Sequence, residues 1–207
     1  MQPRQEVTEY ANRTKFQMRH GLNIIPMYEE NGSPNFSDIL LAQLFRRIVR
    51  EDTLDKIFYD GSIRNTNDFI QFFRNSEHEI YFVEYKGKEV GFFWLNSFKH
   101  KSAFINYCFY KEFWGDKALK ISRLTIEFIF QRKDQHDEHL VDVLLGLTPA
   151  SNKLAIKFLL KNGMTTIGKI PGLLYDASTG AIVDGILSYK QRQEKGTIKI
   201  PTFLFIN

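Results

Sequence analysis

The chain has 207 residues, of which 43% are hydrophobic and 25% charged, and its formal net charge is +4. These proportions are those of a folded globular protein and exclude an intrinsically disordered chain. Basic residues are scattered among acidic ones, which argues against a nucleic-acid-binding stripe. No apolar run approaches the roughly 20 residues that span a bilayer. We therefore expect neither nucleic acid nor a membrane as a partner.

The first half of the chain is predicted to contain one short strand and three helices. Residues 22–27 are the one apolar stretch in a polar, turn-rich start. Ser37 is a suitable N-cap for a helix whose apolar residues recur at helical spacing. These apolar residues are Leu40, Leu41, Leu44, Phe45 and Ile48. Two shorter helices are expected at residues 54–59 and 67–74.

From residue 79 the apolar pattern changes to the period of strands. Residues 79–85 and 89–95 are rich in aromatic and β-branched side chains and flank Lys86-Gly87-Lys88, which is typical of a hairpin loop. Residues 102–110 form a third strand candidate. The three segments are predicted to make an antiparallel meander.

Two helices and three strands are predicted after the meander. A turn at 113–115 leads into a helix with an apolar face, and a strand at 140–148 is expected to stop at Pro149. Ser151 or Asn152 then caps a second helix, which Gly163 ends. Strands are expected at 164–175 and 181–189, and 196–207 is a candidate edge strand. The apolar faces of the two helices are Ala118, Ile121, Leu124, Thr125 and Phe128, and Leu154, Ala155, Phe158 and Leu159.

The order of strand, glycine turn and helix is the feature that points to a ligand. A helix N-terminus presents unpaired backbone N–H groups and the positive end of the helix dipole to an anion. Gly115 would let a phosphate come close to the backbone at this point. By itself, a glycine before a helix is more often a plain turn.

Two segments in the right order resemble the landmarks of the GNAT acyltransferases. Residues 106–118, NYCFYKEFWGDKA, are similar to the strand and pyrophosphate loop of that family, commonly written Q/R-x-x-G-x-G/A. Residues 152–164, NKLAIKFLLKNGM, resemble its second landmark, an Asn with a small residue three positions on and Lys-x-Gly-Phe at the end. The resemblance covers roughly residues 79–189. It is closest in look to the ribosomal-protein N-terminal acetyltransferase type.

The resemblance implies an α/β (α+β) fold with a central twisted, mixed, mostly antiparallel sheet flanked by helices. It also implies transfer of acetyl from acetyl-CoA to an amine of a small molecule or protein. In this family the strand before the loop splays from its neighbour, and the gap admits the thioester. The implied coenzyme A-binding residues are Phe109, Tyr110, Trp114, Gly115, Asp116, Lys117, Ala118 and Asn152.

We interpret residues 1–207 as a single acyltransferase-like domain. It would comprise an N-terminal extension (1–35), a helical part (36–78), a core sheet with the cofactor site (79–190) and a C-terminal tail (191–207). The first residues contain no apolar segment of a secretory signal. Together with the single cysteine, which excludes an internal disulfide, this predicts a cytoplasmic protein.

Three departures from the family pattern bear on activity. Glu112 stands where Gln or Arg is usual, and Lys117 replaces the second glycine, adding either bulk or an ammonium that pairs with a phosphate. Leu159 stands where a Tyr commonly acts as the acid. No carboxylate lies on the strand before the loop, so we expect the base to be water held by Asn106 or by backbone carbonyls. The alternative is a non-catalytic GNAT-like module that binds coenzyme A or another protein.

Other residues invite chemical roles that we do not favour. Cys108 lies in an apolar strand and is expected to be a core thiol. The segment 136–139, HDEH, is expected to be a solvated loop, and we predict no metal site. Ser151 is expected to cap a helix rather than act as a nucleophile. Trp114 either stacks on an adenine or wedges the helix against the sheet. A solvated face is the default expectation for Arg46, Arg47 and Arg50 of the first helix, and an acidic partner on that surface is the alternative.

Overall fold

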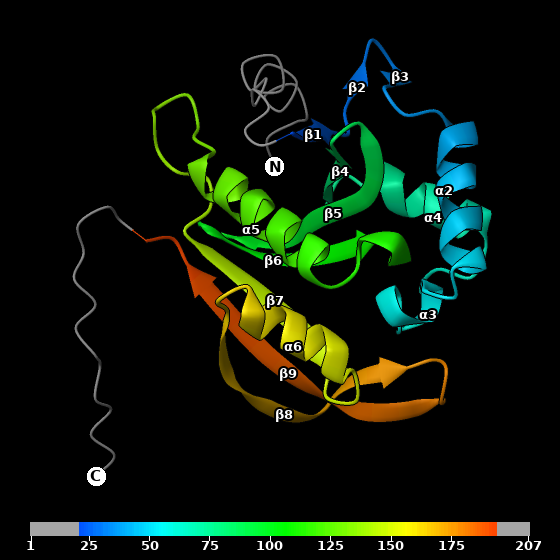
Figure 1. The fold of residues 1–207 in the computed structure, drawn as a ribbon, viewed down its shortest axis with the longest axis vertical. Helices are drawn as coiled ribbons and strands as arrows, with labels where there is room; N and C mark the ends of the chain where they lie inside the picture. The colour runs from blue at the N-terminus through cyan, green and yellow to red at the C-terminus, as the bar shows by residue number, and fades with distance from the viewer. Residues whose placement is uncertain (1–20, 194–207) are drawn as a thin grey trace.

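The computed structural model describes residues 21–193, and its main feature is one seven-stranded sheet in the order β1-β4-β5-β6-β7-β9-β8 (Figure 1). Only β6 and β7 are parallel, and all other neighbours pair antiparallel. The mixed, mostly antiparallel sheet predicted from the sequence is thus confirmed. The strands are β1 Leu22–Pro26, β4 Glu79–Tyr85, β5 Lys88–Lys99, β6 Ser102–Phe109, β7 Val143–Pro149, β8 Thr165–Asp176 and β9 Ala181–Gln191.

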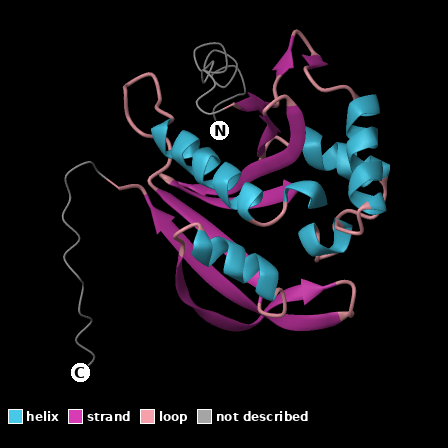
Figure 2. Cartoon of the chain, viewed as in Figure 1, coloured by secondary structure: helices cyan, strands magenta, loops and turns pink. Residues whose placement is uncertain are grey.

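Two groups of helices flank this sheet, as Figure 2 shows, with α5 and α6 apart from α2, α3 and α4. Tyr107 of β6 contacts α5, where its hydroxyl lies 3.1 Å from the Thr125 hydroxyl. Its neighbour Asn106 is paired across strands with Trp94, whose ring stacks on Phe58 just after α3. Since successive strand residues point to opposite faces, the two helix groups cover opposite faces. The helices are α2 Asp38–Arg50, α3 Leu54–Ile57, α4 Thr66–Arg74, the 3-10 turn η1 Lys111–Phe113, α5 Asp116–Gln131 and α6 Lys153–Lys161.

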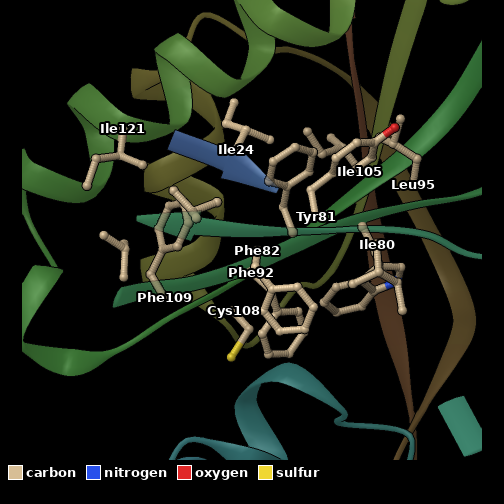
Figure 3. Close-up of a cluster of buried hydrophobic side chains, with 14 of the residues drawn as sticks. Ile24, Ile80, Tyr81, Phe82, Phe92, Leu95, Ile105, Cys108, Phe109 and Ile121 are labelled. Atoms are coloured by element: carbon tan, nitrogen blue, oxygen red, sulfur yellow. The ribbon is translucent and has the colours of Figure 1, made fainter. Parts of the chain in front are cut away.

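The core is dominated by aromatic side chains on both faces of the strands. Figure 3 shows Phe92 and Cys108 on one side of the sheet and Tyr81 and Phe109 on the other, where Ile121 of α5 approaches. All five are buried. The many phenylalanines of the sequence therefore fill two layers, one beneath α2 to α4 and one beneath α5.

Most of the predicted elements are confirmed within one to four residues. Ser37 caps α2 by accepting the Leu40 N–H at 3.3 Å, and Asn152 rather than Ser151 caps α6. Gly163 follows α6 with a φ of +77°. The candidate edge strand at 196–207 lies outside the described residues.

Three details differ from the sequence predictions. Leu154 is 62% exposed, because α6 turns only the side carrying Ala155, Phe158 and Leu159 toward the protein. Pro149 does not follow the end of β7, as expected, but is its last residue, a position where its missing N–H breaks no ladder. A two-residue hairpin, β2 Glu29–Glu30 with β3 Ser33–Pro34, was not predicted because it is too short to show a period.

Gly91 sets the distance between β5 and the end of β6. Its φ is +139°, and a Cβ built there would lie 2.0 Å from the Cys108 carbonyl oxygen. Gly91 pairs with Phe109, the last residue of β6. A side chain at this position would therefore push apart the strands just where β6 leads into the loop.

We expect Gly91→Ala to lower the free energy of unfolding by roughly 2 to 4 kcal/mol, because it combines backbone strain with an overlap against main chain. Gly87→Ala is the matched control, since Gly87 has a φ of +73° but nothing within 4 Å of a built Cβ. That variant should lose only about 1 kcal/mol. Urea unfolding of both variants measures the difference, and equal losses would contradict the steric role of Gly91.

Candidate cofactor and active site

The sheet opens between β6 and β7. These parallel strands pair only at Ser102↔Val143, Ala103↔Leu144 and Phe104↔Leu145. Beyond these pairs β6 continues to Phe109 and β7 to Pro149, each still paired on its other edge, with β5 and β9. The carboxyl ends of the two strands therefore splay apart, as the resemblance implied.

The edge of β6 that faces this opening carries backbone hydrogen-bonding groups. The Tyr110 N–H donates to the Val90 carbonyl at 2.9 Å, which fixes the alternation along the antiparallel pair. Even-numbered residues of β6 therefore direct their N–H and C=O groups toward β5. Beyond the last pair with β7, the N–H and C=O groups of Tyr107 and the N–H of Phe109 point to the opening, where an extended ligand with amide groups could pair with them.

A glycine turn joins the end of β6 to the start of α5. Gly115 has φ +81° and ψ −137°, and a Cβ built on it would meet nothing within 4 Å. The first hydrogen bond of α5 runs from the Leu119 N–H to the Gly115 carbonyl, and no side chain caps the helix. The N–H groups of Asp116, Lys117 and Ala118 thus have no helix carbonyl to bind and lie at the positive end of the helix dipole, which suits an anion.

Trp114 fixes this turn to the strand. Its indole Nε1–H donates to the Phe109 carbonyl at 2.7 Å, while 38% of the side chain stays exposed. The bond supports the structural interpretation of Trp114. Asp116 and Lys117 are exposed beside it, with the Lys117 ammonium 5.8 Å from the Phe113 ring centre, and Ala118 is buried.

The negative charge of Glu112 is neutralised by an arginine that the sequence analysis assigned to solvent. Arg47 of α2 binds Glu112 at 2.6 Å and Glu51 at 3.0 Å. Glu51 uses its second oxygen to accept the Lys111 N–H at 2.8 Å. The expectation of a solvated face is therefore wrong for Arg47, because three-dimensional folding brings the loop onto α2. No local pattern in the sequence shows this contact.

Tyr110 has the surroundings of a core residue. It is 1% exposed, the Arg47 guanidinium lies 3.4 Å from its ring centre, and its hydroxyl donates to Glu89. Burial, and then the Glu89 carboxylate, raise the pKa of Tyr110 above its usual value. Its neighbour Phe109 is the residue whose backbone faces the opening.

Asn106 lies on the face of the sheet opposite α5. It is half-buried, and its Nδ2 donates to the side-chain Oδ1 of Asn96 at 3.4 Å. On the other face, the Tyr107 hydroxyl is held by Thr125, and burial raises the pKa of that phenol. The two amides are thus the polar side chains that this part of β5 and β6 presents to the α2–α4 side.

The start of α6 lies across the opening from β6. Asn152 Oδ1 accepts the Ala155 N–H at 3.0 Å and so caps the helix. The Phe158 ring contacts the rings of Tyr107 at 5.6 Å and Phe109 at 6.4 Å, forming an aromatic wall. Leu159 is buried against β7, where a Cβ built on Gly146 would lie 3.1 Å from its methyl group.

The remaining candidates for a chemical role are the segment 136–139, which forms salt bridges, and Ser151, which lies at the start of a helix. In the segment 136–139, Asp137 binds Lys133 and Glu138 binds Lys101, both at 2.8 Å. Among residues 21–193, no three His, Cys, Asp or Glu side chains are grouped as metal ligands would be. Ser151 is exposed and directly precedes the cap of α6.

Solved structures of acetyltransferases share this fold. An acetyltransferase from Salmonella typhimurium that modifies the N-terminal serine of a 50S ribosomal subunit protein matches with a TM-score of 0.66 and 12% identity, over 84% of this chain and 97% of its own. A microcin self-immunity acetyltransferase in complex with acetyl-CoA and AMP matches with a TM-score of 0.64 and 18% identity, over 84% and 94%. Spermidine N-acetyltransferase from Vibrio cholerae, in complex with CoA and spermine, matches with a TM-score of 0.62 and 13% identity, over 84% and 96%.

These neighbours are GNAT acetyltransferases, and the chain has the GNAT fold. The expected fold is therefore confirmed. No protein-family model and no curated protein matches the sequence. Within the described part of the chain, none of the helices combines the length and apolar character needed to cross a bilayer.

Cys108 provides a direct test of how the core beneath the site is packed. The thiol is 1% exposed, and burial raises its pKa well above the usual value. We expect a thiol reagent at neutral pH to label it only as fast as the protein opens, and completely after denaturation. Rapid labelling of the native protein would show that Cys108 is accessible and would reopen a chemical role for it.

Proposed function

We propose that the chain is an acetyl-CoA-dependent N-acetyltransferase. The observation that carries this proposal is the opening between β6 and β7, which leads directly into the glycine turn and the uncapped start of α5. An extended amide-containing arm and an anionic group joined to it would fit this arrangement together. Coenzyme A has both parts, and two of the neighbouring structures contain it or its acetyl form.

The residues of the chain fit the cofactor in three places. The N–H groups of Asp116, Lys117 and Ala118 would bind the pyrophosphate, with Gly115 allowing close approach. The backbone of Tyr107 and Phe109 would pair with the pantetheine arm along the open edge of β6. Asn152 at the start of α6 would contact the same arm from the far side, while Tyr110 would support the loop from the core.

Bound acetyl-CoA would supply an activated acetyl thioester at the opening. The amine acceptor would approach from the α2–α4 side, where Asn106 and Asn96 lie. We propose that Asn106 orients a water molecule that takes the proton of the amine, because β6 carries no carboxylate for this purpose. The buried Leu159 leaves no phenol at the position where a Tyr would protonate the departing thiolate.

The acceptor is proposed to be an amine of a protein or a small molecule. One neighbour modifies the N-terminal serine of a ribosomal protein, and another acts on spermidine. We propose a cytoplasmic location, because a reducing compartment keeps a single cysteine as a free thiol. A second candidate is a coenzyme A-binding module without turnover, which Leu159 and the lack of a carboxylate on β6 favour.

We expect acetyl-CoA at about 100 times its dissociation constant to stabilise the protein by about 2.7 kcal/mol, and so to raise its melting temperature by several degrees. Gly115→Val should abolish this rise, because it fills the space that the pyrophosphate needs. Gly180→Val is the control, since Gly180 also has a positive φ and open space but lies in the β8–β9 turn. No rise in the wild type would refute the proposal.

An assay with a broad panel of amines separates the two candidate functions. Binding of acetyl-CoA together with acetyl transfer supports the enzyme. Binding without turnover on any amine of the panel would favour the non-catalytic module. A melting temperature that is unchanged in the wild type and in both glycine variants contradicts both.

Lys117 is predicted to compensate for the missing second glycine. As the second residue of α5 it has a helical backbone, so glycine is not required there. We expect Lys117→Ala to weaken coenzyme A binding about fivefold and to flatten its salt dependence, since a partly exposed charge pair contributes about 1 kcal/mol. Lys117→Gly should bind no more tightly than the alanine variant. Calorimetry at low and high salt would contradict this if the glycine variant bound more tightly, independently of salt.

A further inference from the structure

A salt-bridge network joins α2 to the loop between β6 and α5. We infer that Arg47 and Glu51 are positioning residues for residues 111–115, which we call the cofactor loop. This inference rests on the proposed function. It states that two residues of α2, on the side of the sheet proposed for the acceptor, hold the proposed pyrophosphate site in place.

The network attaches the cofactor loop at two points. Arg47 binds the Glu112 carboxylate at 2.6 Å, and Glu51 accepts the Lys111 main-chain N–H at 2.8 Å. Arg47 and Glu51 also bind each other at 3.0 Å, so the two attachments form one unit. One attachment holds a side chain and the other holds the backbone, and together they fix both the position and the direction of the turn.

The part of the network on α2 is partly shielded from solvent, whereas the Glu112 side chain is 55% exposed. The side chains of Arg47 and Glu51 are only 23% and 19% exposed, unlike most surface ion pairs. The Arg47 guanidinium also lies over the Tyr110 ring, 3.4 Å from its centre, and the Tyr110 hydroxyl is held by Glu89. Burial lowers the pKa of Arg47, but the hydrogen bonds that it donates to the Glu51 and Glu112 carboxylates outweigh this effect, and the pKa is raised. The arginine therefore stays charged.

The same arginine also neutralises a carboxylate close to the proposed anion site. Glu112 lies three residues before Gly115 and would repel a pyrophosphate if it were unpaired. Arg47 cancels this charge while it holds the loop. Removing Arg47 should therefore weaken coenzyme A binding in two ways, because the loop loosens and because the Glu112 carboxylate is left unpaired. Removing Glu112 as well should regain only the part of the affinity that the unpaired charge had cost.

The test compares Arg47→Gln with the double variant Arg47→Gln/Glu112→Gln. Without ligand, we expect the Lys111 amide hydrogen of Arg47→Gln to exchange at least about tenfold faster by NMR, since Arg47 no longer holds Glu51. With free coenzyme A in calorimetry, the single variant should bind about tenfold more weakly. The double variant should recover about half of that loss on a logarithmic scale. Arg46→Gln, on an exposed neighbour, is the control and should match the wild type.

Each outcome decides the inference. Unchanged Lys111 exchange in Arg47→Gln overturns positioning, and a double variant that binds no better than the single one overturns the charge argument. If Arg47→Gln does not fold, Glu51→Ala removes the acceptor of the Lys111 N–H and is judged by the same two measurements. If the wild type binds no coenzyme A, the proposed function fails, while Lys111 exchange still tests whether α2 positions the loop.

Discussion

The parallel pairing of β6 with β7 ends after three residues, and the features of the site depend on that short contact. Because the strands separate beyond Phe104, the backbone of Tyr107 and Phe109 faces an opening rather than a neighbouring strand. Aromatic side chains line the opening on the α5 side, where the Phe158 ring of α6 packs against the rings of Tyr107 and Phe109. The glycine turn at the end of β6 then places the start of α5 beside this opening.

The cofactor loop departs from the GNAT pattern that it resembles, and a distant residue balances its charge. Glu112 brings a carboxylate toward the proposed anion site, but Arg47 reaches it from a helix 65 residues earlier in the chain. The compensation therefore lies in the tertiary structure and not in the motif. The same contact makes α2, which packs on the face that carries Asn106, part of the support for the proposed cofactor site.

The site is equipped more clearly for binding than for proton transfer. Asn106 and Asn96 are neutral amides, which orient water but do not take a proton themselves. Tyr107 lies on the opposite face and is hydrogen-bonded to Thr125, and Leu159 is part of the packing between α6 and β7. For the proposed acetyl transfer, such a site would favour acceptors whose amine is already deprotonated when it binds, or whose proton leaves through solvent.

The sequence alone determined most of the elements, their order and the two landmarks, because helix and strand periods, the Ser37 cap, a cap at Ser151 or Asn152 and the glycine turn are local features. It predicted an anion site at Gly115 and the start of α5 only through the resemblance to the GNAT loop, and that site stays a prediction. The tertiary structure decided what depends on distant contacts: the end of β6–β7 pairing, the burial of Tyr110 and the capture of Glu112 by Arg47. A solvated arginine and one bound to a loop have the same local sequence, so only the folded chain could distinguish them.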